Sequence, residues 1–169
     1  VPFPRSAPVR TSGYNAPAFG DVDRDGHLDF VVGVVGGSYD PNRTTIANLL
    51  YYAGTPGHDF ALRTDRLLSQ LDVGSESIPV LADLDGDGDL DLLLGIMYEP
   101  AERGTSRQWR YASVGPRSTP RVRWRGAVPL RGHYHMAPAV GDLDGDGDVD
   151  LLTGSFSARV AFARNDAGV

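Results

Sequence analysis

The sequence contains no cysteine and no lysine, and it has no long uninterrupted run of apolar residues. Without cysteine there is neither a disulfide framework nor a metal site built on thiolates. No apolar run approaches the roughly 18 residues that a membrane-spanning helix needs, so we expect no membrane span. The apolar fraction of 41% is typical of a folded globular protein rather than a disordered one.

Motifs of common enzyme classes are also missing from the 169 residues. There is no G-x-S-x-G, no H-E-x-x-H and no phosphate-binding loop. We therefore predict no catalytic residues and a non-enzymatic protein, unless the chain is part of a larger enzyme. The net charge of −6 and the lack of a recognised motif disfavour nucleic acid as a partner.

Acidic residues, in contrast, are concentrated in three short loops. DVDRDGHLD begins at Asp21, DLDGDGDLD at Asp83 and DLDGDGDVD at Asp142, and together they hold 14 of the 22 acidic residues. One divalent cation in each loop would bring the formal charge of −6 to zero. Such crowding of like charge beside hydrophobic segments is easier to explain if a cation lies among the carboxylates.

The loops are part of a longer internal repeat of about sixty residues. Upstream of them, APAFGD, IPVLAD and APAVGD each place a proline four residues before the first aspartate. Downstream, LDFVVG, LDLLLG and VDLLTG follow, and then a third segment: NLLYYAG, QWRYASVG and RVAFARN. A fourth segment is HDFALRTD and PRVRWRG, which VPFPRSAPVR at the start of the chain resembles.

Each of these segments has strand composition and is bounded by turn-forming residues. We predict an all-β chain in which each repeat forms four antiparallel strands, as in the blades of a β-propeller. FVVG and LLLG are predicted inner strands that are covered on both faces. TDRLLSQLD, residues 64–72, is the best helix candidate, but it is short. The predicted module covers residues 1–169, with repeats at about 11–65, 73–125 and 132–169; strand 1–10 or another chain completes the third.

Three repeats are fewer than the usual 4–8 blades of a closed propeller. We therefore expect the chain to be part of a larger propeller or of one completed by oligomerisation. A lone arc would leave two apolar faces open, which favours self-association or further blades that cover them.

The loop pattern D-x-D-x-D-G-x-x-D brings alternating carboxylates to one point, and its glycine permits the sharp turn. Hard oxygen donors of this kind favour calcium, with magnesium as the weaker candidate, and we predict about three calcium ions per chain. An EF-hand is excluded, because it needs a glutamate at position twelve and flanking helices. The predicted side-chain ligands are Asp21, Asp23, Asp25, Asp29, Asp83, Asp85, Asp87, Asp91, Asp142, Asp144, Asp146 and Asp150. The predicted backbone carbonyl donors are His27, Asp89 and Asp148.

The loops and their flanking segments resemble the FG-GAP repeats of integrin α-chain propellers and the related bacterial VCBS repeats. The resemblance covers essentially the whole chain. It implies calcium loops that join the first and second strands of each blade, on one face of the disc, with partners on the other face or the side. The first loop departs from the other two at Arg24 and His27. We expect its site to be the weakest.

The loops on the opposite face are the candidate ligand-binding surface, because they vary in length between repeats. The candidate residues are Tyr14, Tyr39, Arg43, Glu76, Tyr98, Glu99, His133, Tyr134 and His135. They could equally be ordinary variable loops. Arg121, Arg123 and Arg125 alternate with apolar residues, which indicates a protected outer strand or a site for an acidic partner.

Taken together, these features predict a calcium-binding, non-catalytic scaffold that binds or adheres to protein or glycan. The expected location is extracellular, at the cell surface or periplasmic, where calcium is abundant. Two alternatives remain open. The chain could be the propeller part of a larger secreted polysaccharide lyase or hydrolase, or a structural subunit of a surface assembly.

Overall fold

The computed structural model describes residues 15–34, 49–57, 59–63, 76–96, 108–114, 121–127, 136–155 and 160–166. All secondary structure in these residues is β-strand, which confirms the all-β prediction. No helix long and apolar enough to cross a membrane occurs in this part of the chain. The helix candidate at residues 64–72 and the predicted strand at 1–10 lie outside the described residues.

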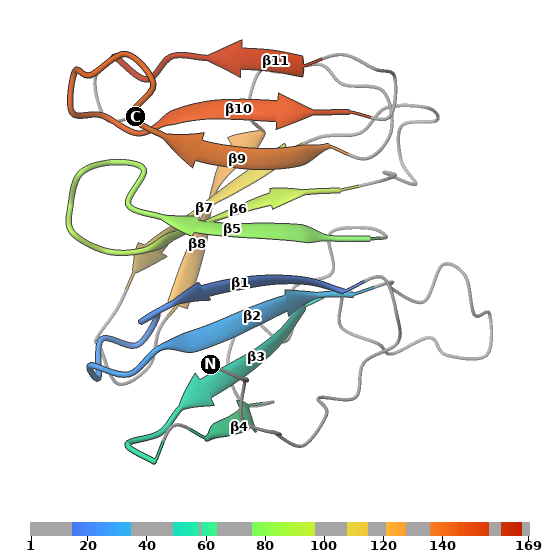
Figure 1. Cartoon of the computed structure of the whole chain (residues 1–169), viewed down its shortest axis with the longest axis vertical. Helices are drawn as coiled ribbons and strands as arrows, with labels where there is room; N and C mark the ends of the chain where they lie inside the picture. The colour runs from blue at the N-terminus through green and yellow to red at the C-terminus, as the bar shows by residue number, and fades with distance from the viewer. Residues whose placement is uncertain are drawn as a thin grey trace, which may run out of the picture.

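Eleven described strands form three antiparallel sheets, one for each repeat (Figure 1). The first sheet has the order β1(Ala16–Gly20), β2(Asp29–Gly33), β3(Leu49–Gly54) and β4(Phe60–Arg63). The second has the order β5(Ile78–Ala82), β6(Asp91–Gly95), β7(Gln108–Val114) and β8(Arg121–Ala127). The third contains β9(Ala137–Gly141), β10(Asp150–Gly154) and β11(Val160–Ala163). Among the described strands, each pairs only with its neighbours along the chain.

The register is the same wherever the repeats can be compared. Gly20 pairs with Asp29, Ala82 with Asp91 and Gly141 with Asp150, so each acidic loop closes a hairpin at the same point. One irregularity interrupts the pairing of β7 with β8, between Arg110 and Tyr111. β8, which carries the predicted arginine stripe, lies at the edge of the second sheet.

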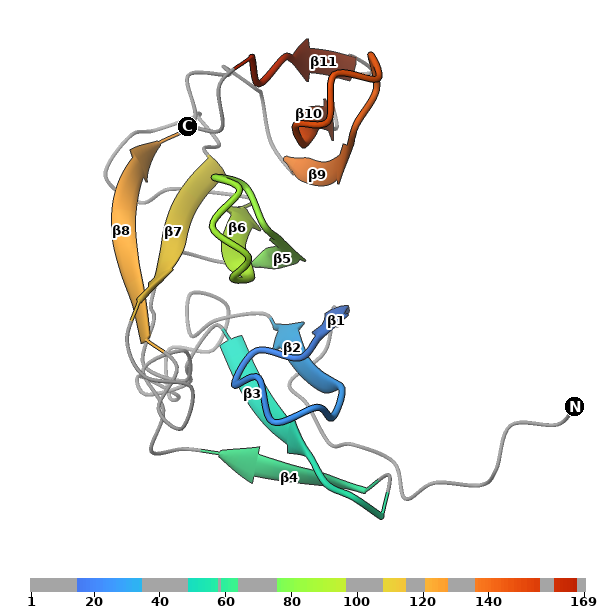
Figure 2. The same ribbon diagram turned by 90° about the vertical axis from the view of Figure 1, so that its left-hand side faces the viewer.

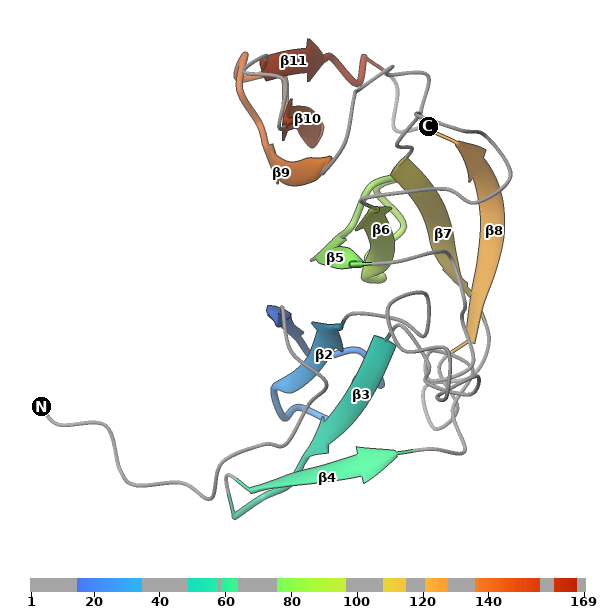
Figure 3. The same cartoon turned by 90° about the vertical axis from the view of Figure 1, so that its right-hand side faces the viewer.

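The three sheets pack one after another and fan out from a common centre. The first strands β1, β5 and β9 contact one another in succession near that centre, while β4 and β8 lie at the periphery (Figures 2 and 3). The described strands occupy an open arc, with the second sheet between the other two. The first and third sheets are therefore the two ends of the stack.

Side chains alternate along each strand, so each sheet has two faces. We call the face on the side of the next sheet in sequence the forward face, and the opposite face the backward face. The forward face of the first sheet carries Val31 and Tyr51. The backward face carries Phe30 and Tyr52 there, and Leu92 in the second sheet. A buried cluster joins the two kinds of face at the first junction: Val31, Leu49, Tyr51 and Ala53 pack with Leu92 and Leu94.

The second strands are the most completely buried elements. All five residues of β2 and all five of β6 are buried, as predicted for inner strands. β10 differs, because Leu152 on its forward face is exposed.

A glycine at the end of each second strand marks the junction between sheets. A side chain at Gly33 would overlap the backbone carbonyl of Ser77, and one at Gly95 would overlap that of Met136. The prolines that follow, Pro79 and Pro138, place their rings against the same two glycines. The close approach requires glycine, and it explains why the repeat ends its second strand with this residue.

Candidate metal centres

The three acidic loops lie at one edge of the stack, on the left in Figure 1. Each connects the first strand of a sheet to the second, because the hairpin register brings those strand ends together. The predicted ligands of each repeat thus lie in one hairpin loop, and the three loops lie at the same edge of the stack.

Within each loop the first aspartate accepts hydrogen bonds from the backbone of the turn. Asp21 accepts from Gly26 N at 2.9 Å, Asp83 from Gly88 N at 2.9 Å, and Asp142 from Gly147 N at 3.1 Å. The fifth-position aspartate accepts from the residue two positions later at 2.9 Å in all three loops. These bonds coil the chain around the carboxylates and satisfy turn donors that the short hairpin leaves unpaired.

The sixth-position glycine has a left-handed conformation in every loop. Its φ is +88° at Gly26, +86° at Gly88 and +97° at Gly147. This conformation strains residues with a side chain, which gives the predicted turn glycine its physical reason.

Carboxylate oxygens converge in each loop to within 4.8 Å of one another. The converging groups are Asp21, Asp23 and Asp29 in the first loop, Asp83, Asp85 and Asp87 in the second, and Asp142, Asp144 and Asp146 in the third. The first group differs from the others, since it includes the ninth-position aspartate and not the fifth. All donors in the three groups are carboxylate oxygens, and such a set fits a hard cation such as calcium better than zinc or copper.

The ninth-position aspartates have a structural role that the sequence alone did not reveal. Asp29, Asp91 and Asp150 are buried, with at most 1% of each residue exposed. Asp29 accepts from Val22 N at 2.8 Å, Tyr51 Oη at 3.0 Å and Gly54 N at 2.8 Å. It therefore ties the loop to the end of β3, and its charge is compensated by several donors.

Asp150 makes the equivalent connection in the third sheet. It accepts from Asn165 N at 2.9 Å and from Leu143 N at 3.0 Å. The Asn165 bond, the Leu143 bond and nearby Arg164 together hold the pKa of Asp150 below its usual value, although burial acts in the opposite direction. This carboxyl consequently stays ionised to lower pH than a free aspartate.

Two arginines neutralise part of the loop charge, and the spacing of the motif gave no sign of either contact. Arg24 of the first loop pairs with Asp89 of the second loop. Arg164 lies with Nε 2.7 Å from Asp144 and 3.4 Å from Asp166. Arg24 has φ +58°, whereas Gly86 and Gly145 occupy the same loop position with φ +73° and +83°. A non-glycine residue there carries backbone strain, and the contact with the neighbouring loop offsets part of it.

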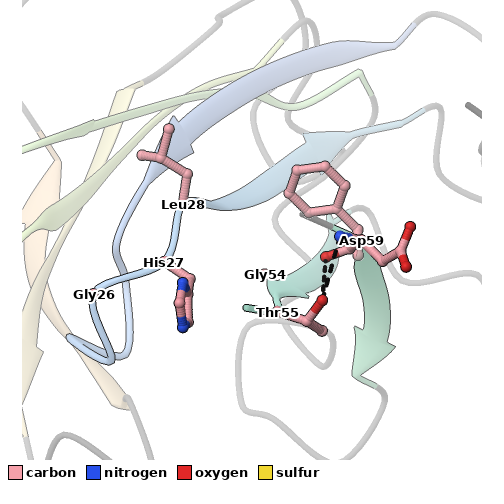
Figure 4. A pocket seen from close by; sticks show the side chains of 7 residues that line it. Gly26, His27, Leu28, Gly54, Thr55 and Asp59 are labelled. Atoms are coloured by element: carbon pink, nitrogen blue, oxygen red, sulfur yellow. Dashed lines mark hydrogen bonds between the residues drawn. The ribbon is translucent and has the colours of Figure 1, made fainter. Parts of the chain in front are cut away.

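A pocket of about 300 Å³ lies between the first loop and the β3–β4 turn (Figure 4). His27 and Leu28 form one side, and Gly54, Thr55 and Phe60 form the other. The hydroxyl of Thr55 bonds the backbone of Asp59 at 3.2 Å, which fixes the turn. The pocket carries few groups that could orient a substrate, and we assign it no role.

Most of the candidate ligand-binding surface lies outside the described residues. This part comprises Tyr14, Tyr39, Arg43, Tyr98, Glu99, His133, Tyr134 and His135. Glu76 is described: it precedes β5, at the end of that strand remote from the acidic loop, and it is 8% exposed with φ +54°. Its burial leaves little of this residue accessible to a ligand.

No family model matches the sequence, and a search of curated proteins finds no match. The assignment of a function therefore rests on the residues of the loops and on their arrangement.

Proposed function

We propose that this chain is a calcium-binding β-propeller segment that serves as a non-catalytic binding or adhesion scaffold outside the cell, for a protein or glycan partner. The observation that carries the proposal is the threefold recurrence of one loop: same hairpin position, same backbone bonds to carboxylates, same left-handed glycine. A single acidic turn has little meaning, but three in register indicate selection for one ligand.

The arrangement of the sheets supports the propeller part of the proposal. Each of the two complete sheets is a four-stranded meander, and successive sheets pack face to face with their first strands nearest the centre. Such packing is what radially repeated propeller blades would require, and it therefore supports the proposal. The motifs that resemble FG-GAP repeats point to the same architecture.

Calcium would act structurally in such a scaffold. The clustered carboxylates repel one another, and the ion would offset that repulsion and hold each hairpin closed. The residues that would hold it are the nine clustered aspartates together with the predicted carbonyl donors. Asp29, which belongs to the first carboxylate group and also accepts from Gly54 N, would then connect the ion to the third strand of the first sheet.

Isothermal titration of calcium into the chelator-treated protein tests this proposal. We expect about three ions per chain and preference for calcium over magnesium. At a calcium concentration 100 times the Kd, each site would add about 2.7 kcal/mol to the free energy of unfolding. A folded protein that takes up no calcium, and whose thermal midpoint calcium does not change, would refute it.

Variants in single loops sharpen the titration. Asp83→Asn with Asp87→Asn should remove one site of the three and leave the other two. The matched control is Asp59→Asn, which neutralises an exposed carboxylate outside the loops and should leave all three.

The binding role requires a separate measurement. Labelled protein applied to a glycan array and to immobilised cell-surface proteins, with about 1 mM calcium or with chelator, should show calcium-dependent retention. Turnover of a glycan, rather than retention, would favour the secreted-enzyme alternative.

A further inference from the structure

Among the residues whose exposure is described, which leave out β7 and β8, the exposed large hydrophobic residues lie in the first and third sheets and their loops. Four belong to the first sheet and its loop: Phe19, Leu28, Phe60 and Leu62. The other four belong to the third sheet and its loop: Leu143, Leu152, Val160 and Phe162. Such residues are ordinary when scattered, but here they form two groups at opposite ends of one arc, which marks an interaction surface.

The first group lies on the backward face of the first sheet. Phe19, Phe30, Tyr52 and Leu62 face one another across successive strands in the pairing register, so they form one row. The rings are in contact: the centroid of Phe30 lies 4.6 Å from Tyr52, 4.7 Å from Phe60 and 5.7 Å from Phe19. Phe30 and Tyr52 at the centre of the row are buried, and Phe19, Phe60 and Leu62 around them are exposed. The second sheet packs its equivalent residues, Leu81 and Leu92, against the first sheet.

The second group lies on the forward face of the third sheet. Leu152 and Phe162 are paired in register, as Val31 and Tyr51 are in the first sheet. Leu152 is 38% exposed, Phe162 49% and Val160 69%, whereas Val31, Tyr51 and Leu49 at the equivalent positions are 0% exposed. The positions are apolar in both sheets, and only the neighbour is missing from the third.

The glycines at the junctions show the same difference between inner and outer faces. The space beside Gly33 and Gly95 is occupied by the backbones of Ser77 and Met136, but no atom lies within 4 Å of a Cβ placed at Gly154. Ser77 and Met136 are 1% exposed, while Asn15, the equivalent residue before β1, is exposed. Pro17 is likewise exposed, whereas Pro79 and Pro138 are buried.

We infer that two copies of this chain associate head to tail, with the forward face of the third sheet of one copy against the backward face of the first sheet of the other. The chain itself contains this kind of interface twice, at the two junctions between its sheets. The two open faces carry the same residue positions as the two sides of those junctions, so they are complementary to each other. They lie at opposite ends of the arc, so a second copy supplies the missing partner.

Closure of the ring fixes the number of copies. A head-to-tail interface produces a ring or an open filament. Two copies would give six sheets, within the 4–8 blades of known propellers, whereas three copies would give nine. The inference therefore predicts a dimer with two identical interfaces, in which Pro17 seats on Gly154 and Phe19 packs near Leu152 and Phe162 of the partner. It rests on the proposed packing of sheets as blades and not on the calcium sites.

Analytical ultracentrifugation and native mass spectrometry in calcium-containing buffer test the inference. The wild-type chain of 18.1 kDa should sediment as a dimer. Phe19→Asp and Phe162→Asp should each weaken dimerisation by at least about 30-fold, because each puts a charge into both interfaces. Pro56→Asp, which adds the same charge at the exposed β3–β4 turn, should leave the dimer intact.

Mixing the two charged variants is the decisive measurement. A Phe19→Asp chain keeps an intact third sheet, and a Phe162→Asp chain keeps an intact first sheet. An equimolar mixture should therefore recover a dimer through one intact interface. If the third sheets paired with each other instead, Phe19→Asp alone would remain dimeric, and this outcome would overturn the inference.

Other outcomes also separate the two proposals. A wild-type monomer that binds three calcium ions would overturn head-to-tail pairing and leave the proposed function standing. A dimer that binds no calcium would overturn the proposed calcium function and leave head-to-tail pairing standing. Leu62→Asp and Leu152→Asp repeat the test on the same faces if either first variant fails to give a folded circular dichroism spectrum.

Discussion

Val31 in the first sheet and Leu152 in the third occupy the same position of their repeats, yet Val31 is buried and Leu152 is exposed. The same contrast holds for Gly33 and Gly154, and for Tyr51 and Phe162. The first and third repeats thus share a sequence pattern and differ in their neighbours. The comparison teaches that the repeat encodes a contact with the next repeat as well as its own sheet.

The largest effect should come from closing the space at a junction. Gly33→Ala would push a methyl group into the Ser77 backbone, which cannot rotate away as a side chain could, and should cost about 3 kcal/mol. Gly154→Ala, tested in the monomeric Phe19→Asp background, should change stability by less than about 0.5 kcal/mol. Urea unfolding measures both. An equal loss in the free energy of unfolding at the two sites would show that the forward face of the third sheet is covered in the monomer.

Next in size is the buried aspartate that ties a loop to the third strand. Asp29→Asn should lower the free energy of unfolding by about 2 kcal/mol even in chelator. The carboxylate accepts hydrogen bonds from two N–H groups and one hydroxyl, and the NH₂ of asparagine cannot accept those that now reach the oxygen it replaces. Asp25→Asn, at an exposed position of the same loop, should lose less than about 0.5 kcal/mol in chelator. With calcium present, both variants should show weaker binding at the first loop. A similar loss for both in chelator would contradict the structural role of Asp29.

The smallest effect concerns Arg24, which stands where the other loops have glycine. Arg24→Gly should relieve left-handed strain of about 1 kcal/mol and remove an ion pair with Asp89 that contributes less than that. The variant should therefore be slightly more stable than wild type, and more clearly so in about 1 M salt, which screens the pair.

Gly145→Arg in the monomeric Phe19→Asp background is the matched control, because it places arginine at φ +83° in the third loop, with no following loop among the described residues of that monomer. It should lose about 1 kcal/mol at any salt concentration. If Gly145→Arg were neutral, the strain assigned to Arg24 would have to be abandoned.

The strands and the acidic loops were predictable because they depend on local sequence. Alternation, punctuation by Gly and Pro, and the repeated D-x-D-x-D-G-x-x-D pattern fixed the strand positions and the turn glycines. Contacts between repeats were not predictable in the same way. The pair Arg24–Asp89 and the bond from Asn165 Nδ2 to Leu84 O at 3.3 Å join residues far apart in sequence, and only the packing of sheets brings them together.

The role of the ninth-position aspartates shows the same limit. The motif identified Asp29 as a ligand candidate, but the donors on Tyr51 and Gly54 come from β3, more than twenty residues later. A buried tyrosine needs a partner for its hydroxyl, and this requirement was a usable signal for Tyr51. The calcium ligands, the partner surface and the location outside the cell stay predictions.

The pairing of each strand only with its sequence neighbours has a consequence for how the chain folds. Every ladder among the described strands joins strands that are adjacent in sequence, so each of these sheets is a locally encoded unit. During synthesis from the N-terminus, the first sheet can form before the second has been made, and the growing stack then offers each new sheet a surface on which to assemble. The late step is the docking of finished sheets, and the aromatic row of the first sheet is the surface that stays uncovered longest.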